Sequence, residues 1–373
     1  MIRIEALLPG KRLKEFIDFP HELHKDDPNY VPELFVAQQD MLTPGKHPFY
    51  EHSTVQLFLA YKDERLVGRI AAIWNKNHIE FTGNSEGFFG FFDVINDQEV
   101  AEALLQSASS WVKEKGGEKI IGPVTLSTNE SCGLLIEGYD SPPVAMMLYN
   151  PPYYKTILEN AGYTKQVDLY AYQIVREEAN ERSVKLLSAL EARLAVRGIK
   201  IRQVNLKDFK NEVRKIREVY NKAWDKNLGF VPTTESEFDY LAKDLKMILD
   251  PKYCLVAEKG DEFVGFILGI PDINQILIKI KKGRLLPTGI FKLLFQKKDI
   301  TCLRVITLGV LEDYRKLGIE ACLYGSVIRN AEGSKIKTSE CSWMLEHNYL
   351  MNRAIEQING KLYKRYRIFE KQV

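Results

Sequence analysis

The residues best placed to do chemistry follow an apolar run, 303–310, that predicts a β-strand. A short polar turn carries Arg315 and Lys316, then comes Gly318, and a helix is predicted from Ile319. The first amide hydrogens of a helix have no partner within it, and the helix dipole favours an anion there. Glycine lets a phosphate approach the backbone, and the two cations add charge-assisted contacts. This pattern predicts a site for a pyrophosphate.

The same residues carry a resemblance to a family. Val310, Arg315 and Gly318 resemble the pyrophosphate loop of GNAT acyltransferases, a strand ending in Val followed by Arg/Gln-x-x-Gly-x-Gly/Ala. The resemblance implies that loop amides bind acetyl-CoA (or another acyl-CoA) as cosubstrate, with no metal. The chain departs from the motif at Glu320, whose carboxylate would repel a pyrophosphate. The implied cofactor-binding residues here are Leu308, Val310, Arg315, Lys316, Leu317, Gly318, Ile319 and Glu320.

The downstream segment is similar to the same family, with a predicted strand at 340–346, a helix at 347–358 and a strand at 361–369. In GNAT proteins the two central strands splay apart and hold the pantetheine arm. By resemblance, Asn348 or Asn352 would contact CoA, and Tyr363 would be the general acid that protonates the thiolate. Tyr349 and Tyr366 are alternatives to Tyr363. The acids expected nearest to the reaction are Glu346, at the end of the first of these strands, and Glu312, in the turn after Val310; the alternative is that both are solvated residues at a strand or turn end.

A direct transfer also needs a neutral amine, so a base or an ordered water must take its proton. Amides near 308–310 could supply donors to the oxyanion. In the family, helices before the first hairpin line the acceptor site, which implies Trp224, Asn227 and Phe230 as substrate-binding residues. An equally weighted alternative is an apolar plug between a helix and a loop.

Two hairpins, at 55–74 and 253–271, match with an offset of 197 residues, and Gly162 and Gly360 lie 198 apart. This agreement predicts two copies of one fold. The predicted class is α/β (α+β), with two tandem GNAT-like domains at 1–178 and 179–373. Each is expected to be a mixed, mostly antiparallel twisted sheet flanked by helices.

The first copy has an acidic turn at 93–100 without arginine or glycine, so it predicts a degenerate domain that shapes substrate binding. In the second copy, segment 275–299 is basic and amphipathic. Such a segment either lies on a membrane surface or forms a helical cover over the substrate cleft.

The composition of the chain argues against several classes of protein. Lys+Arg is 52 against Asp+Glu 50, which argues against a general nucleic-acid coat. The five cysteines have no C-x-x-C spacing and predict reduced, buried thiols. No signal peptide and no membrane-spanning run is recognised, which makes a cytoplasmic protein the expectation. The expected partner is a small-molecule or peptide amine, and a homodimer is one assembly to test.

These observations predict an acyl-CoA-dependent N-acyltransferase that moves an acetyl group to an amine by direct attack. Two alternatives stay open. One is a CoA-binding or sensing protein without turnover, suggested by Glu320. The other is a Fem-type aminoacyl transferase that uses aminoacyl-tRNA, suggested by the tandem arrangement.

Overall fold

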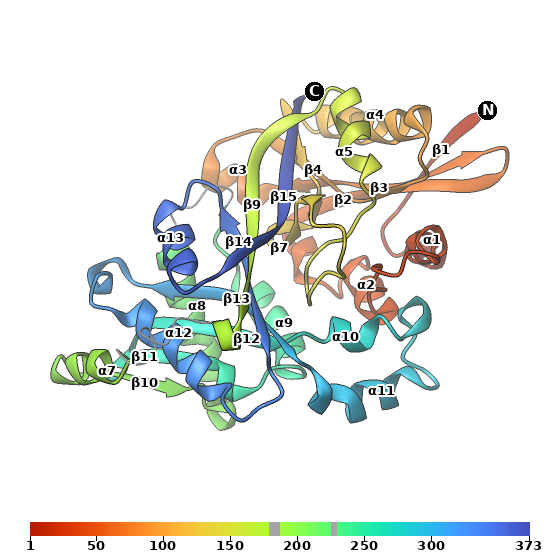
Figure 1. Ribbon diagram of the computed structural model, residues 1–373. Helices are drawn as coiled ribbons and strands as arrows, with labels where there is room; N and C mark the ends of the chain where they lie inside the picture. Colours follow the sequence, from red (N-terminus) through yellow and green to blue (C-terminus); the bar gives the residue numbers. More distant parts are fainter. Residues whose placement is uncertain (179–186, 225–229) are drawn as a thin grey trace. The chain divides into compact units, whose positions relative to one another are not determined.

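The computed structural model describes residues 1–178, 187–224 and 230–373 (Figure 1). Contacts divide the chain into two compact units. Unit 1 comprises Met1–Leu169, Asn274–Leu294 and Lys364–Val373, and unit 2 comprises Tyr170–Ile273 and Phe295–Tyr363. Each unit is therefore assembled from separate segments, whereas the predicted domains 1–178 and 179–373 are continuous. The predicted domains divide the chain by its sequence repeat, whereas the units divide it by contacts. The units therefore do not test the predicted borders, which stay a prediction.

The sheet of unit 1 has the strand order β1-β2-β3-β4-β5-β15, and β8 also pairs with β15. Only β4 and β5 are parallel among the pairs described here. The elements of unit 1 are β1 (Ile2–Leu7), α1 (Leu13–Leu23), α2 (Phe35–Met41), β2 (Ser53–Lys62), β3 (Arg65–Asn75), α3 (Lys76–Thr82), β4 (Glu86–Val94), α4 (Gln98–Glu114), β5 (Lys119–Gly122), β6 (Val124–Thr125), β7 (Ser127–Cys132), β8 (Leu134–Glu137), α5 (Tyr153–Asn160), α10 (Asn274–Leu277) and the greater part of α11 (Gly289–Gln296).

Unit 2 has the strand order β14-β13-β12-β11-β10, in which only β13 and β14 are parallel. Its elements are α7 (Leu187–Val196), β10 (Ile199–Gln203), α8 (Phe209–Trp224), α9 (Glu235–Lys246), β11 (Cys254–Lys259), β12 (Glu262–Pro271), β13 (Cys302–Val310), α12 (Ile319–Asn330), β14 (Thr338–Leu345) and α13 (Tyr349–Gln357). The short 3₁₀ turns are η1 (Pro48–Glu51), η2 (Arg176–Glu178), η3 (Leu206–Asp208), η4 (Pro251–Tyr253), η5 (Lys281–Gly283), η6 (Lys297–Asp299) and η7 (Glu312–Tyr314).

The internal repeat extends to the strand register. Ala60 pairs with Gly68 in the first hairpin and Ala257 pairs with Gly265 in the second, again 197 residues apart. Both hairpins have a bulge directly after that alanine. A bulge re-aims the strand that follows it, so the two hairpins twist alike at equivalent points.

The last strands of the two copies are β9 (Thr164–Val175) and β15 (Lys361–Gln372), and each one starts in one unit and ends in the other. The part of β15 after Tyr363 belongs to unit 1, where it pairs with β5. Within unit 1, Arg367 of β15 binds Asp168 of β9 with Nε–Oδ1 and Nη2–Oδ2 distances of 2.7 and 3.1 Å. The chain thus exchanges its final strands between the units, which the sequence pattern did not predict.

The core of unit 1 forms where α4 packs on β2, β3 and β4, through side chains such as Leu104 and Val112. The core of unit 2 forms where α8 packs on β12 and β13, through Ile216, Val219 and Phe266. All five cysteines are buried and free, as predicted, and burial raises the pKa of Cys302 to about 12. In the described part of the chain, no helix is both long and apolar enough to cross a membrane.

Candidate functional site

The central feature of unit 2 is a gap between β13 and β14. Their parallel register runs from Cys302–Thr338 to Val305–Cys341 and ends there, while β13 continues to Val310 and β14 to Leu345. Every residue of both strands is described, so the strands separate after the fourth pair. The gap lies where the sequence predicts a splay between two central strands. Ile306, Thr307 and Leu308 are half-buried here, whereas the strand before them is buried.

The loop from β13 to α12 closes one end of this strand. Lys316 and Gly318 have positive φ values of 66° and 93°, which bend the chain into the first turn of α12. Gly318 is the residue that caps α12, and it has no side chain to satisfy the first amides. Among the described residues, the backbone amides of Lys316, Leu317 and Gly318 have no acceptor. Such a cluster of free amides at a helix N-terminus favours an anion.

Arg315 donates to two backbone carbonyls of the chain itself. Its Nε donates to the carbonyl oxygen of Val310 at 3.3 Å, and its Nη2 donates to that of Ala223 at 3.1 Å. The guanidinium therefore fastens the loop to the end of β13 and the end of α8. Lys316 is exposed beside it, and Glu320 is half-buried in the first turn of α12.

A buried carboxylate that the sequence reasoning missed lies at the closed end of the gap. Glu340 is only 1% exposed and accepts hydrogen bonds from the hydroxyls of Tyr363 and Ser342. Arg304, opposite Glu340 in the strand register, donates from Nε to Ser342 Oγ at 3.2 Å and stacks over the ring of Trp343. The available signal was a charged residue in each of two predicted strands, because buried charges are rare unless they are paired or functional.

The asparagines of α13 have clear structural roles. Asn348 caps the helix by accepting from the amide of Met351 at 3.3 Å. Asn352 is buried, and its Nδ2 donates to the carbonyl of Leu345 at 3.1 Å, at the end of β14. The Oδ1 of Asn352 is buried without a partner among the described residues. This leaves one acceptor at the side of the gap.

The other predicted acids and tyrosines lie in different surroundings. The side chain of Glu346 is 14% exposed at the end of β14, with His347 Nε2 at 3.7 Å. Tyr363 is half-buried and is the tyrosine that contacts Glu340, whereas Tyr349 is exposed and Tyr366 is fully buried.

The predicted acceptor residues form part of an apolar cluster. Trp224 stacks on Tyr220 with ring centroids 4.9 Å apart, and Phe230 packs edge-on against Tyr220 with ring centroids 5.7 Å apart. The Trp224 ring also lies against Gly309, where a Cβ atom would come within 2.3 Å of it. Trp224 therefore lies on β13, beside the loop. Asn227 lies outside the described residues.

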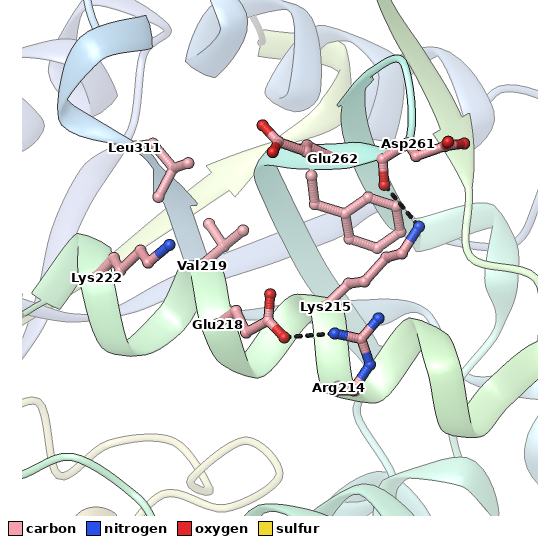
Figure 2. Close-up of a pocket in the computed structure, with 9 residues that line it drawn as sticks. Arg214, Lys215, Glu218, Val219, Lys222, Asp261, Glu262 and Leu311 are labelled. Atoms are coloured by element: carbon pink, nitrogen blue, oxygen red, sulfur yellow. Dashed lines mark hydrogen bonds and ion pairs between the residues drawn. The ribbon is translucent and has the colours of Figure 1, made fainter.

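A separate polar depression of about 250 Å³ lies between α8 and the β11–β12 turn (Figure 2). Two of its three cations have partners close by, since Arg214 binds Glu218 and Lys215 donates to the carbonyl of Asp261 at 2.7 Å. The depression contains none of the predicted site residues.

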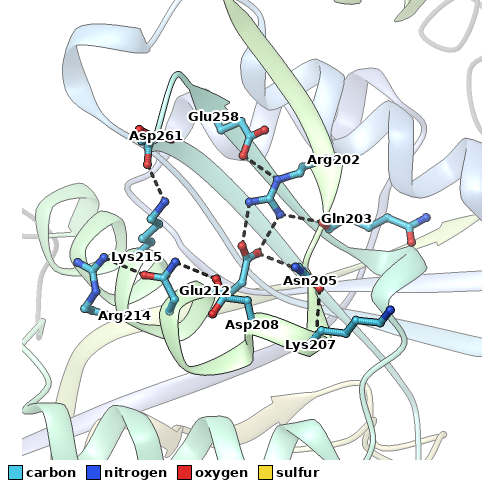
Figure 3. A network of polar contacts seen from close by, with 11 residues as sticks. Arg202, Gln203, Asn205, Lys207, Asp208, Glu212, Arg214, Lys215, Glu258 and Asp261 are labelled. Carbon is cyan, nitrogen blue, oxygen red and sulfur yellow. Dashed lines mark hydrogen bonds and ion pairs between the residues drawn. The ribbon is translucent and has the colours of Figure 1, made fainter.

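The neighbouring polar network explains why α8 is fixed in place (Figure 3). Arg202 binds both carboxylate oxygens of Glu212 on α8 at 2.9 and 2.8 Å, and Glu258 on β11 at 2.6 Å. The hydrogen bond with Glu212 contributes most to raising the pKa of Arg202. The network thus stabilises the helix whose C-terminal end receives Arg315.

The equivalent place in unit 1 is closed. Asp97 caps α4, accepting from the amide of Val100 at 3.3 Å and pairing with Lys62 at 2.6 Å. The strand β6 lies so close to β4 that a Cβ on Gly90 would come within 1.6 Å of the Val124 carbonyl oxygen. The chain's own carboxylate occupies the helix N-terminus, and its own backbone lies beside the strand.

No family model matches the sequence. Protein YghO of Escherichia coli (strain K12) is 36% identical over 378 residues, which cover 99% of this chain and 95% of YghO. Bacterial ceramide synthase of Caulobacter vibrioides (strain NA1000 / CB15N) is 34% identical over 381 residues, with coverage of 98% and 97%.

Among solved structures, a tandem GNAT protein from the clavulanic acid biosynthesis pathway, without AcCoA, matches with a TM-score of 0.59. The identity is 10%, and the match covers 100% of this chain and 98% of that one. A GCN5-related N-acetyltransferase from Sphaerobacter thermophilus matches with a TM-score of 0.50 and 14% identity, covering 100% and 95%. The predicted fold, two GNAT-like copies in tandem, is confirmed.

Proposed function

Because this chain belongs to the family of Protein YghO and Bacterial ceramide synthase and has a tandem GNAT fold, we propose that it is an acyl-CoA-dependent N-acyltransferase. The observation that carries the proposal is the gap between β13 and β14. One end of β13 leads into free amides at Gly318, and the closed end holds the Glu340–Tyr363 pair. One continuous strand therefore connects an anion site to a possible acid–base group.

In this proposal, the amides of Lys316, Leu317 and Gly318 hold the pyrophosphate of CoA. Backbone groups of β13 beyond Val305 pair with the pantetheine arm, because β14 no longer pairs with that strand edge. The free Oδ1 of Asn352 can accept from an amide N–H. Acyl-CoA supplies the activated thioester, and the remaining steps fall to the chain's own side chains.

We assign proton transfer to Glu340 and Tyr363 together. The amine must lose its ammonium proton before it attacks, and a second proton must reach the departing thiolate. Glu340 is almost fully buried, whereas Tyr363, which donates to it, is only half-buried, so in this proposal a substrate reaches Glu340 through the Tyr363 hydroxyl. A tyrosine that donates to a carboxylate is a poor acid by itself, because its anion would face a negative charge. Tyr363 therefore relays protons to and from Glu340.

The acceptor proposed here is the amino group of a long-chain amine. Support comes from Bacterial ceramide synthase, which matches nearly the whole chain. Ceramides are amides of long-chain amino alcohols, so the bond formed is the amide that the GNAT reaction makes. Acetyl was the acyl group predicted by resemblance; a fatty acyl group is the one this relative favours.

The test is amide formation, followed by mass spectrometry, from sphinganine with acetyl-CoA or palmitoyl-CoA. Glu340→Gln and Tyr363→Phe should lower kcat by about 10²- to 10⁴-fold, the range for general acid–base groups, with little change in KM for the acyl-CoA. Glu356→Gln is the matched control, because Glu356 also accepts from a tyrosine, Tyr172, at 3.5 Å in unit 2. It should leave kcat unchanged.

Other outcomes point to the alternatives. CoA binding with no amide from any amine or acyl-CoA would favour the CoA-binding protein without turnover. Salt-sensitive binding of aminoacyl-tRNA, with no CoA binding, would favour the Fem-type transferase.

A further inference from the structure

Segment 274–296 leaves an apolar helix face open to solvent. In α11, Phe291, Leu294 and Phe295 are 57%, 68% and 68% exposed, and Leu286 just before the helix is 78% exposed. Positions 291, 294 and 295 share one face of a helix. A helix on the surface of a soluble protein normally turns its polar face outward, so an outward apolar stripe indicates a surface that binds something.

The rest of this segment is firmly attached to unit 1. Asn274 Nδ2 donates to the carbonyl of Pro143 at 2.9 Å, and Arg284 binds both oxygens of Asp18 at 2.8 and 2.9 Å. Gly283 packs so closely on the backbone of Glu33 that a Cβ would come within 1.8 Å of its carbonyl oxygen. These contacts hold the segment that leads into α11 (Figure 1) in place on unit 1.

Positive charge surrounds the apolar face. No residue from 279 to 298 is acidic. Lys281 and Lys298 are exposed, while Lys292 Nζ donates to the carbonyl of Lys279, which does not neutralise its charge. Two of the seven basic residues between 279 and 298 form ion pairs, Lys282 with Glu22 and Arg284 with Asp18. Four of the seven do not pair with an acid that the structure describes: Lys281, Lys292, Lys297 and Lys298. The seven are Lys279, Lys281, Lys282, Arg284, Lys292, Lys297 and Lys298.

We propose that α11, with Leu286, docks this protein on an anionic lipid bilayer. Apolar side chains enter the interface while the flanking lysines contact lipid phosphates. A second copy of the chain fits less well, because it would bring the same positive charges face to face. The face is a convex helix rather than a groove, which suits a lipid surface better than a peptide. The proposal does not depend on the proposed function, although a membrane would supply a long-chain amine.

The experiment is flotation of the full chain with vesicles of phosphatidylcholine alone or of equal amounts of phosphatidylcholine and phosphatidylglycerol. Wild type should float with the anionic vesicles, and added salt should weaken this binding. The double variant Phe291→Ser/Leu294→Ser should lower the partition coefficient by at least about tenfold, since two inserted side chains are lost. Lys281→Gln/Lys292→Gln should reduce the preference for phosphatidylglycerol.

The matched control is Leu8→Ser/Phe81→Ser, which removes two other exposed apolar side chains from unit 1. It should bind vesicles like wild type, and circular dichroism should show each variant folded. Failure of wild type to float at low salt, or equal losses in the control, would overturn the proposal. It would also be overturned if wild type were a dimer and Phe291→Ser/Leu294→Ser a monomer by light scattering, because the occupant would then be a second copy.

Discussion

Replacing Gly318 by aspartate tests the anion site most directly. The residue has φ 93° and caps α12, and in the described part of the chain its own amide and those of Lys316 and Leu317 have no acceptor. An aspartate there would carry its carboxylate to the position proposed for the pyrophosphate. The new Cβ would meet only the end of the Leu190 side chain, at 3.2 Å. The fold should therefore survive the change.

Two effects of this substitution can be estimated separately. Adopting a left-handed conformation costs a non-glycine residue about 1 to 2 kcal/mol, which lowers the free energy of unfolding. A carboxylate about 5 Å from a phosphate charge costs about 2 to 3 kcal/mol at a half-exposed site, or about 30- to 150-fold in Kd. The free energy of CoA binding should thus fall by more than the free energy of unfolding does.

Calorimetry of CoA binding, with thermal unfolding in parallel, separates these effects. Gly318→Asn keeps the shape without the charge and should lose much less affinity than Gly318→Asp. Gly333→Asp is the matched control, because Gly333 has φ 70° with nothing within 4 Å of a Cβ, and it should bind CoA like wild type. Equal CoA affinity in Gly318→Asp and wild type would refute the assignment of the loop.

Three further predictions follow from the two units. Calorimetry should find one CoA per chain, because Asp97 occupies the helix N-terminus of unit 1; two sites would contradict this. Burial opposes ionisation of Asp93, but the charge of Arg69 and hydrogen bonds from His24 and Arg69 lower its pKa to about 2 from 3.8. That carboxylate stabilises the fold above pH 4 by about 2 kcal/mol, lost as the pH falls through 2, so thermal unfolding of Asp93→Asn should depend less on pH over this range. A fragment 179–373 lacks Tyr170–Val175, which belong to unit 2, so its circular dichroism spectrum should be that of an unfolded chain. A native-like spectrum of this fragment would show that β9 is dispensable.

Local features of the fold could be predicted from the sequence because their causes are local. The two hairpins repeat with a constant offset, and the strand, loop and helix around Gly318 consist of consecutive residues. The exchange of β9 and β15 could not be predicted in this way. Both strands occupy equivalent positions in their copies, so either pattern fits either sheet, and only contacts distant in the sequence decide the pairing.

The residues of the candidate site could likewise be predicted only where they are neighbours in the sequence. The loop residues are contiguous and match a motif, so the sequence alone was enough to propose them. Glu340 is the single acidic residue of β14, and its role depends on contacts with Tyr363 and Ser342, which form only in the folded sheet. Arg315 was found, but its bonds to the Val310 and Ala223 carbonyls depend on where α8 ends, which the motif does not specify.

The two copies differ at one equivalent position, the residue that caps the helix after the fourth strand of each sheet. Asp97 satisfies an amide of α4 with its own side chain, a cap that stabilises a helix by about 1 kcal/mol. Gly318 gives up that cap, adopts a conformation costly to other residues and leaves neighbouring amides without acceptors. Both features of Gly318, the missing cap and the left-handed conformation, leave α12 without the stabilisation that Asp97 gives to α4. A ligand that accepts hydrogen bonds from those amides would restore the lost stability, so the less stable arrangement in unit 2 favours a bound anion there, and the capped helix in unit 1 does not.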